Sequence, residues 1–147
     1  MVNLTDFEAY WQQMLNKVTA IKSVHFVTEE GEIATKLSDI KKEEQPFLLV
    51  VIPSAKSTGS TQDNFQEDNL NLIYILSKED SYNKTTFELQ KDLQPATEAV
   101  KVQLIMDKSS CGLMRNLDVG SFQTDPEKKK FTSCSGWSVS FSFGDNF

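Results

Sequence analysis

The sequence predicts one α+β domain spanning residues 1–147, with a central mixed or antiparallel sheet of about five to six strands. The sheet is expected to pack against an N-terminal helix and a long, kinked second helix. Three patterns predict this: a stripe of apolar residues at helical spacing near the N-terminus, a continuous apolar run at 47–52, and strict alternation over 137–143. A chain of 147 residues is near the commonest size of a single domain and can bury a sizeable core.

The N-terminal segment has the pattern of an amphipathic helix over roughly residues 5–20. Thr5 and Glu8 have the spacing of a capping box, in which the two side chains satisfy amide donors at a helix start. The apolar residues that recur at steps of three and four are Leu4, Phe7, Trp11, Met14 or Leu15, Val18 and Ile21. We expect this stripe to face the core rather than to form a binding surface.

A short hairpin is predicted next. Residues 24–28 are β-branched and aromatic, residues 29–32 supply a turn, and residues 33–35 form the second strand. The charged segment 38–45 then reads as a connection that ends at Pro46.

Two buried strands are predicted at 47–52 and 70–76, adjacent to each other in the sheet centre. Between them, residues 53–69 change abruptly to Ser, Thr, Gly, Asp, Asn and Gln, which predicts a long polar loop. A loop of this length in a compact domain is usually functional or disordered, and two roles stay open for it: a mobile connection, or an assembly loop that orders on binding.

The second helix is predicted at roughly 80–109, kinked or broken near Gln94 because Pro95 lacks an amide donor and clashes with the preceding turn. Strands follow at about 113–123 and at 137–143. In the last strand Trp137, Val139, Phe141 and Phe143 alternate with serines, which predicts one buried face and one wet face.

Composition argues against several classes of protein. Fifteen basic residues against twenty-one acidic ones give a net charge of −6, which disfavours general nucleic-acid binding. The lysines at 128–130 are expected to lie in a solvated loop between strands. The N-terminus lacks the pattern of a signal peptide and no apolar run is long enough to span a bilayer, so we expect no membrane association and a cytoplasmic location.

Residues capable of chemistry are few and scattered. His25 is the sole histidine, and Ser23 beside it matches no nucleophile signature. Cys111 and Cys134 are twenty-two residues apart, unlike the paired spacings of zinc sites. We expect free thiols, with a disulfide as the minor alternative because both cysteines flank predicted strands. The sequence therefore assigns no catalytic, cofactor-binding or metal-binding residue.

Two predicted loops resemble ligand-binding motifs but lack residues that those motifs require. Residues 50–59 run from a strand into a Ser/Lys/Gly loop but lack the first glycine and the Gly-Lys-Ser/Thr ending of a phosphate loop. Asp63, Glu67 and Asp68 do not have the alternate spacing or the central glycine of a calcium loop. We expect both segments to be solvated loop.

The order of elements resembles that of small prophage proteins of the tail-terminator or tail-completion type, encoded among phage structural genes in gut bacteria. The matching segments are Val24-His25-Phe26, the strand at 46–51, Asp68-Asn69 ahead of the strand at 73–76, the helix at 80–108 and the ending at 136–143. The resemblance implies an α+β subunit that assembles, often as a ring, on the end of a tail tube and binds other virion proteins. It implies no catalytic residue, and it would make the protein virion-associated.

Three functions stay open at this point. The first is a non-enzymatic structural or assembly subunit with tail proteins or copies of itself as partners. The second is a small cytoplasmic protein-binding module that uses a sheet edge or a groove beside the kinked helix. The third, remote one is a small-molecule enzyme that uses His25 or paired carboxylates.

Overall fold

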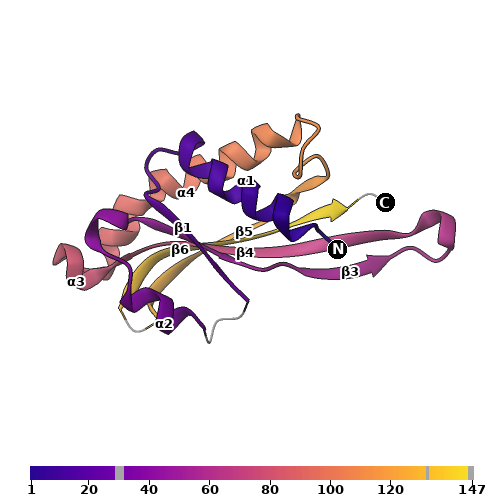
Figure 1. The fold of residues 1–147 in the computed structure, drawn as a ribbon. Coiled ribbons are helices and arrows are strands. Elements are labelled where there is room, and N and C mark those ends of the chain that lie inside the picture. The colour runs from indigo at the N-terminus through magenta and orange to yellow at the C-terminus, as the bar shows by residue number, and fades with distance from the viewer. Residues whose placement is uncertain (29–31, 132, 146–147) are drawn as a thin grey trace.

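The computed structural model describes residues 1–28, 32–131 and 133–145. Within these residues the chain forms four α-helices and one six-stranded mixed sheet, so the α+β prediction is confirmed (Figure 1). The elements are α1 (Leu4–Lys17), β1 (Ser23–Val27), α2 (Ile33–Ser38), β2 (Phe47–Val51), β3 (Ser54–Thr58), β4 (Gln66–Lys78), α3 (Glu79–Tyr82), α4 (Thr86–Lys108), β5 (Leu117–Lys130) and β6 (Cys134–Asp145).

The sheet has the strand order β1-β2-β4-β6-β5. β1 pairs with β2 in parallel and the other pairs are antiparallel. β3 continues the line of β2 along the same side of β4, since Val50 pairs with Ile73 and Ser54 pairs with Leu70. Pro53 lies between the two strands, where no hydrogen bond of the sheet requires a backbone amide donor.

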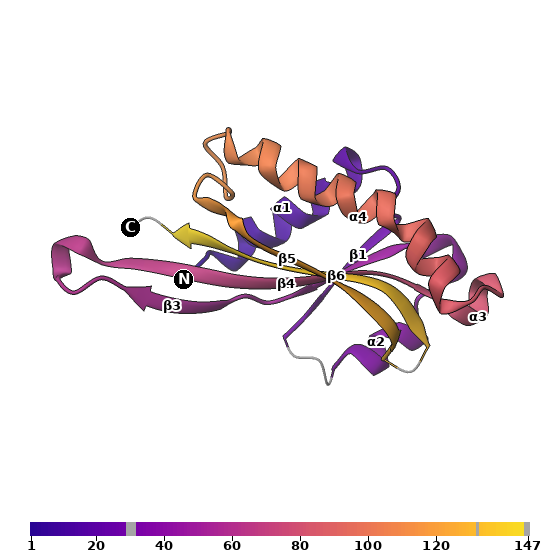
Figure 2. The same ribbon diagram turned by 180° about the vertical axis from the view of Figure 1, so that it is seen from behind.

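Two helices cover one face of the sheet. α1 and α4 lie side by side on it, and the main core fills the space beneath them (Figures 1 and 2). The aromatic stripe of α1 is buried there as predicted, with Phe7, Trp11 and Met14 at 0% exposure. A smaller apolar cluster lies on the opposite face, where the short helix α2 covers one end of the sheet.

The predicted hairpin over 24–35 is wrong. Its first strand exists as β1, but residues 33–38 form a helix, and β1 pairs with β2 in parallel instead. The predicted turn falls largely on residues outside the described part of the chain. Ile33 and Leu37, four residues apart, bury their side chains with Ile40 in the smaller cluster, which favours a helical turn there.

The predicted polar loop over 53–69 is also wrong in large part. Residues 54–58 form β3, and β4 begins at Gln66, so a two-stranded ladder occupies most of the segment. The segment carries no apolar period because most of its residues are exposed, and pairing with β4 rather than burial makes it a strand.

The helix boundaries differ from the prediction. Asn3, not Thr5, caps α1, and its side chain accepts hydrogen bonds from the amides of Thr5 and Asp6. A capping box does occur, at Thr85 and Glu88 at the start of α4. Pro95 lies inside α4 without ending it, and the break in the predicted second helix falls earlier, at Asn83, which has a left-handed backbone (φ 49°).

The closing strands are longer than predicted. β5 begins at Leu117 rather than near 113, and it runs through Pro126 to Lys130 with two register shifts against β6. The lysines at 128–130 are therefore at the end of β5 rather than in a free loop. In β6, Val139, Phe141 and Phe143 are buried as the alternation predicted. The predicted wet face is wrong in part, because Ser138 is buried as well.

Candidate functional site

The most distinctive feature of the molecule is an arm of β3 and β4 whose tip projects beyond the helix-covered body (Figures 1 and 2). We define the arm as residues 54–70, that is β3, the connection after it and the first part of β4. Its strands pair antiparallel from Ser54 opposite Leu70 to Thr58 opposite Gln66. At the base of the arm, β6 pairs with the other side of β4 as far as Glu67, which lies opposite Asp145. Because β4 continues without interruption into the sheet centre, the arm is an extension of the core sheet.

The tip of the arm depends on a glycine. Gly59 has φ 103°, in the region that side chains rarely adopt. A Cβ atom at this position would lie 1.8 Å from the carbonyl oxygen of Asn64, so there is no room for a side chain. A short 3-10 turn (Gln62–Asn64) then returns the chain to β4.

The arm exposes two large apolar side chains. Phe65 is 45% exposed and Leu70 is 57% exposed. Leu70 points to the same face of β4 as Tyr74, which is buried because the cluster beneath α2 covers that end of the strand. The exposure of Leu70 follows from the short reach of α2.

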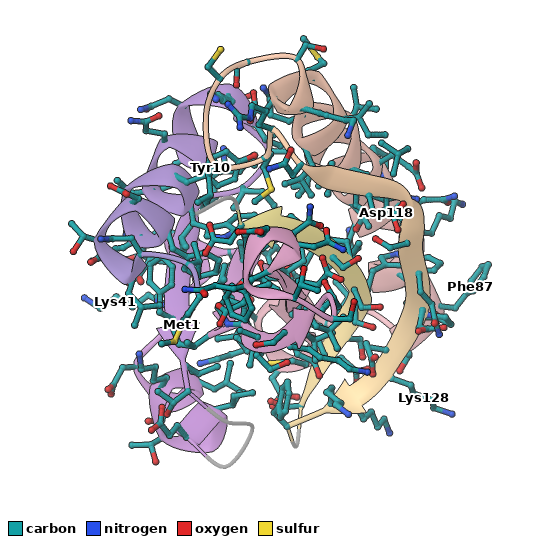
Figure 3. The ribbon with its side chains drawn as sticks, turned by 90° about the vertical axis from the view of Figure 1, so that its right-hand side faces the viewer. Met1, Tyr10, Lys41, Phe87, Asp118 and Lys128 are labelled. Carbon is teal, nitrogen blue, oxygen red and sulfur yellow. The ribbon has the colours of Figure 1, made fainter. Side chains whose placement is uncertain are left out.

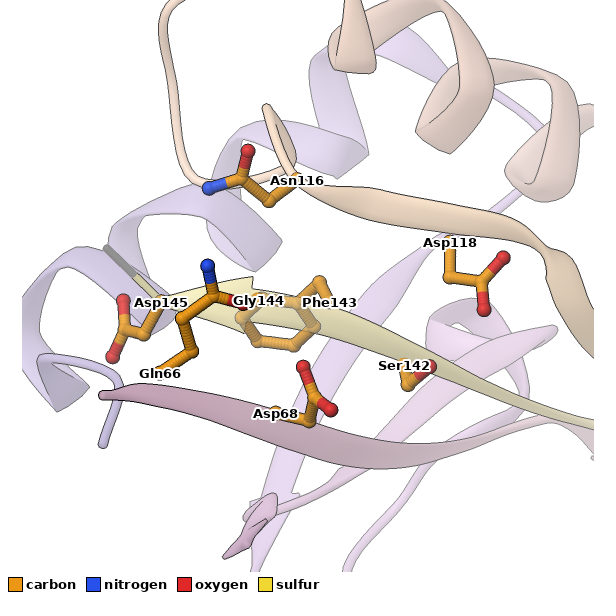
Figure 4. Close-up of a pocket in the computed structure, with 8 residues that line it drawn as sticks. All are labelled: Gln66, Asp68, Asn116, Asp118, Ser142, Phe143, Gly144 and Asp145. Atoms are coloured by element: carbon orange, nitrogen blue, oxygen red, sulfur yellow. The ribbon is translucent and has the colours of Figure 1, made fainter. Parts of the chain in front are cut away.

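A polar pocket of about 250 Å³ lies beside the base of the arm (Figure 4). Gln66 and Asp68 come from β4, Asp118 from β5, Asn116 from the turn before β5, and the remaining wall is Ser142, Phe143, Gly144 and Asp145 of β6. The three aspartates make the pocket acidic.

Three carboxylates at this end of the molecule, those of Glu67, Asp118 and Asp145, have partners. Asp118 Oδ1 accepts a hydrogen bond of 3.0 Å from the Gly120 amide. The Met1 amino group forms ion pairs with Glu67 and, at 3.3 Å, with Asp145. Across the described residues, no group of three or more His, Cys, Asp or Glu side chains is arranged to hold a metal ion.

His25 and Ser23 come together, but not as a catalytic pair. Ser23 Oγ lies 2.9 Å from His25 Nε2, and it donates its one proton to the Glu44 carbonyl oxygen at 2.7 Å. Nε2 of the imidazole must therefore carry the proton and donate it to Ser23, which is the reverse of what activation of a serine nucleophile needs. Burial lowers the pKa of His25, with a smaller upward effect of Glu44 and a further lowering by Lys36.

The two cysteines lie at opposite ends of β6. Cys134 begins the strand and is fully buried, whereas exposed Cys111 lines a second polar pocket with Gly144 and Asp145 at the far end. Ten residues of strand separate these ends by roughly 30 Å, far beyond the reach of a disulfide. Both thiols are free, and burial raises the pKa of Cys134 to about 11.

A small apolar pocket of about 170 Å³ lies between β2, β4 and the start of α4. Its walls are Pro46, Ser77, Tyr82, Lys84, Leu89, Asp92 and Leu93. The surface that this pocket exposes is mostly apolar.

The sequence prediction missed the arm and its exposed residues. It placed Leu70 in a buried strand and left Phe65 inside a loop. The acidic residues Asp63, Glu67 and Asp68 are on the arm, where Asp68 helps to form the polar pocket. One feature of the sequence could have indicated the arm: the turn-forming residues Gly59 and Ser60 lie between two polar stretches.

Across the described residues, none of the helices is both long and apolar enough to cross a lipid bilayer. No protein-family model matches the chain, and a search of curated proteins finds no match.

Proposed function

We propose that this protein is a non-enzymatic assembly subunit that acts through protein–protein contacts, of the type found at the end of a phage tail. The projecting arm carries the proposal. A rigid extension of the core sheet that displays Phe65 and Leu70 is suited to reach a neighbouring subunit. Its role is cytoplasmic during assembly and virion-associated afterwards.

The arm favours a head-to-tail contact. An arm that docks on a different surface of the next copy makes a heterologous interface, which closes into a ring or continues as a filament. The partners are then further copies of this chain and the tail proteins on which a ring would be seated.

Substitution of Leu70 tests the proposal. We expect the unmodified protein to form assemblies larger than a dimer in sedimentation velocity, and rings or short stacks in electron micrographs. Leu70→Thr introduces a β-branched residue, which strands favour, but removes the exposed apolar contact, so it should shift the protein to smaller species. The matched control is Val119→Thr on β5, where an apolar residue is 42% exposed and lies outside the arm.

Two outcomes would contradict the proposal. One is a protein that stays no larger than a dimer at all concentrations and also fails to bind isolated phage tail tubes. The other is equal assembly of Leu70→Thr and the unmodified protein. The genes on either side of the coding sequence give an independent check, because phage structural genes are expected there.

A second candidate is a protein-binding module, favoured by the apolar pocket beside α4. A bound peptide would contact the side chain of Tyr82 there, beside Leu89 and Leu93, which the fold already buries. In that case Tyr82→Ala, checked first for folding, would abolish partner binding while leaving arm-dependent assembly intact. An enzymatic role has the least support, because the Ser23 proton points away from His25.

A further inference from the structure

The helix α4 carries apolar residues on both of its faces. Its inner face packs on the sheet through Leu89, Leu93, Val100 and Leu104. The outer face carries both charged and apolar residues, and it holds four of the nine large apolar side chains that the described residues expose, namely Phe87, Val102, Ile105 and Met106. Phe87 is 72% exposed and points away from the body of the protein (Figure 3), and Val102 is 52% exposed.

Phe87 and Val102 lie at the two ends of one exposed stripe along α4. At 3.6 residues per turn, Phe87, Lys91, Pro95, Glu98 and Val102 lie on the same side of the helix. All five are exposed. From Phe87 to Val102 the stripe spans fifteen residue steps of α4, a length of about 22 Å, enough for a helix-to-helix contact.

The charges in the stripe are arranged symmetrically. Lys91 and Glu98 are equally far from the midpoint between Gln94 and Pro95, and Phe87 and Val102 are also equally far from it. Two copies of α4 packed antiparallel about this midpoint would place Lys91 of each copy against Glu98 of the other. The same arrangement places each Phe87 against the other copy's Val102.

We propose that the outer face of α4 binds a second copy of this chain, through an antiparallel, two-fold symmetric helix pair centred between Gln94 and Pro95. The contact is isologous, so each favourable pair occurs twice. A parallel pair would instead bring Lys91 against Lys91 and Glu98 against Glu98, which the like charges disfavour. Glu98 already contacts Lys101 of its own helix at 3.4 Å, which holds its carboxylate at the surface.

This contact is separate from the arm. It closes at two copies, whereas head-to-tail docking of the arm builds larger assemblies. Leu70→Thr should therefore leave the α4 pair intact, and substitutions on α4 should leave arm-dependent assembly intact. Failure of one proposal is thus distinguishable from failure of the other.

Charge exchange tests the pairing. In a Leu70→Thr background we expect a concentration-dependent dimer in sedimentation equilibrium between roughly 1 and 100 μM, the range of a contact at the small end of specific interfaces. Lys91→Glu alone and Glu98→Lys alone should each weaken the dimer at least about tenfold, because each places like charges in contact twice. The double variant should restore dimerisation to within about threefold of the background protein. Both residues are exposed, and circular dichroism with urea unfolding confirms that each variant is folded.

Cross-linking fixes the direction of the pair. With Cys111→Ser to remove the exposed native thiol, the double variant Phe87→Cys, Val102→Cys should form a disulfide-linked dimer on mild oxidation. Phe87→Cys alone should not. The proposal is overturned by a monomer over the whole concentration range, by single charge variants that dimerise as well as the background protein, or by a double variant that stays monomeric. Capture of a different protein by a monomeric form would assign this face to that partner instead.

Discussion

The Tyr10 hydroxyl on α1 donates a hydrogen bond of 2.7 Å to Oδ2 of Asp107 on α4, across ninety-seven residues of sequence. The same carboxylate accepts from Lys17 Nζ at 3.2 Å and from Gln103 Nε2 at 2.8 Å. One aspartate therefore joins the two helices that cover the sheet. Burial and the nearby Asp107 charge raise the pKa of Tyr10, so the hydroxyl stays protonated as a donor.

Removal of this link should destabilise the helix layer. We expect Tyr10→Phe to lower the free energy of unfolding by about 1–2 kcal/mol, since it deletes a partly buried hydrogen bond to a charged group. Tyr82→Phe is the control, because its hydroxyl makes longer bonds of 3.3 and 3.5 Å. A double-mutant cycle with Asp107→Asn, measured by urea unfolding, should show coupling, and strict additivity would contradict the link.

Gly136 should not tolerate a side chain. Its φ is 156°, and a Cβ atom there would lie 2.1 Å from the Ile75 carbonyl oxygen in the centre of the sheet. We expect Gly136→Ala to cost roughly 2–4 kcal/mol of folding free energy. Gly120→Ala is the control and should change stability by less than about 0.5 kcal/mol, because its nearest neighbour is a flexible side chain at 3.4 Å. Similar thermal midpoints for the two variants would refute this account.

Stability should fall in mild acid because of His25. Its pKa in the folded protein is lower than the ordinary 6.5, so below that pH the unfolded chain binds a proton that the folded protein excludes. The free energy of unfolding therefore decreases as the pH falls from about 7 until it reaches the lowered pKa. His25→Gln should remove this contribution while every carboxylate remains in place. Urea titrations of both proteins at several pH values measure the difference, and parallel pH profiles would contradict it.

The cap of α1 distinguishes the structure from the sequence-based prediction. Asn3→Ala should cost about 1 kcal/mol, because the Asn3 side chain satisfies two amide donors at the helix start. Thr5→Ala should cost less than about 0.5 kcal/mol. The reverse order in urea unfolding would restore the predicted capping box at Thr5 and Glu8.

The two thiols should react very differently. Exposed Cys111 should be modified quickly by a disulfide reagent at pH 8, whereas Cys134 should react only when the protein unfolds, since it is buried and its pKa is raised to about 11. One reactive thiol in the native protein and two in denaturant are expected. Absence of any thiol in unreduced, denatured protein would instead indicate a disulfide.

Much of the sheet could be predicted because burial leaves a mark on the sequence. The run at 47–52 is apolar on both faces, since β2 lies between helices above and the smaller cluster below. In the same way Val139, Phe141 and Phe143 face the core and their alternation predicts β6. The helix α1 could be predicted for the same reason, because its buried residues recur at helical spacing.

The arm could not be predicted from hydropathy because the side chains of β3 are exposed to solvent. β3 is held by backbone pairing with β4, and that pairing imposes no apolar period on Ser54–Thr58. α2 was missed for a different reason: six residues make fewer than two turns, too few for a helical stripe to emerge. The exposure of Leu70 depends in turn on where this short helix ends, which no local pattern of the sequence encodes.

The continuity of β4 from the arm into the sheet also has a mechanical consequence. Its hydrogen bonds to β2 and β6 lie nearly perpendicular to the strand, so a pull along the arm loads them in shear, all at once. The ladder would have to fail as a unit before the strand could slide. A subunit anchored in this way could carry tension from a neighbour directly into its own core without first unfolding at the edge.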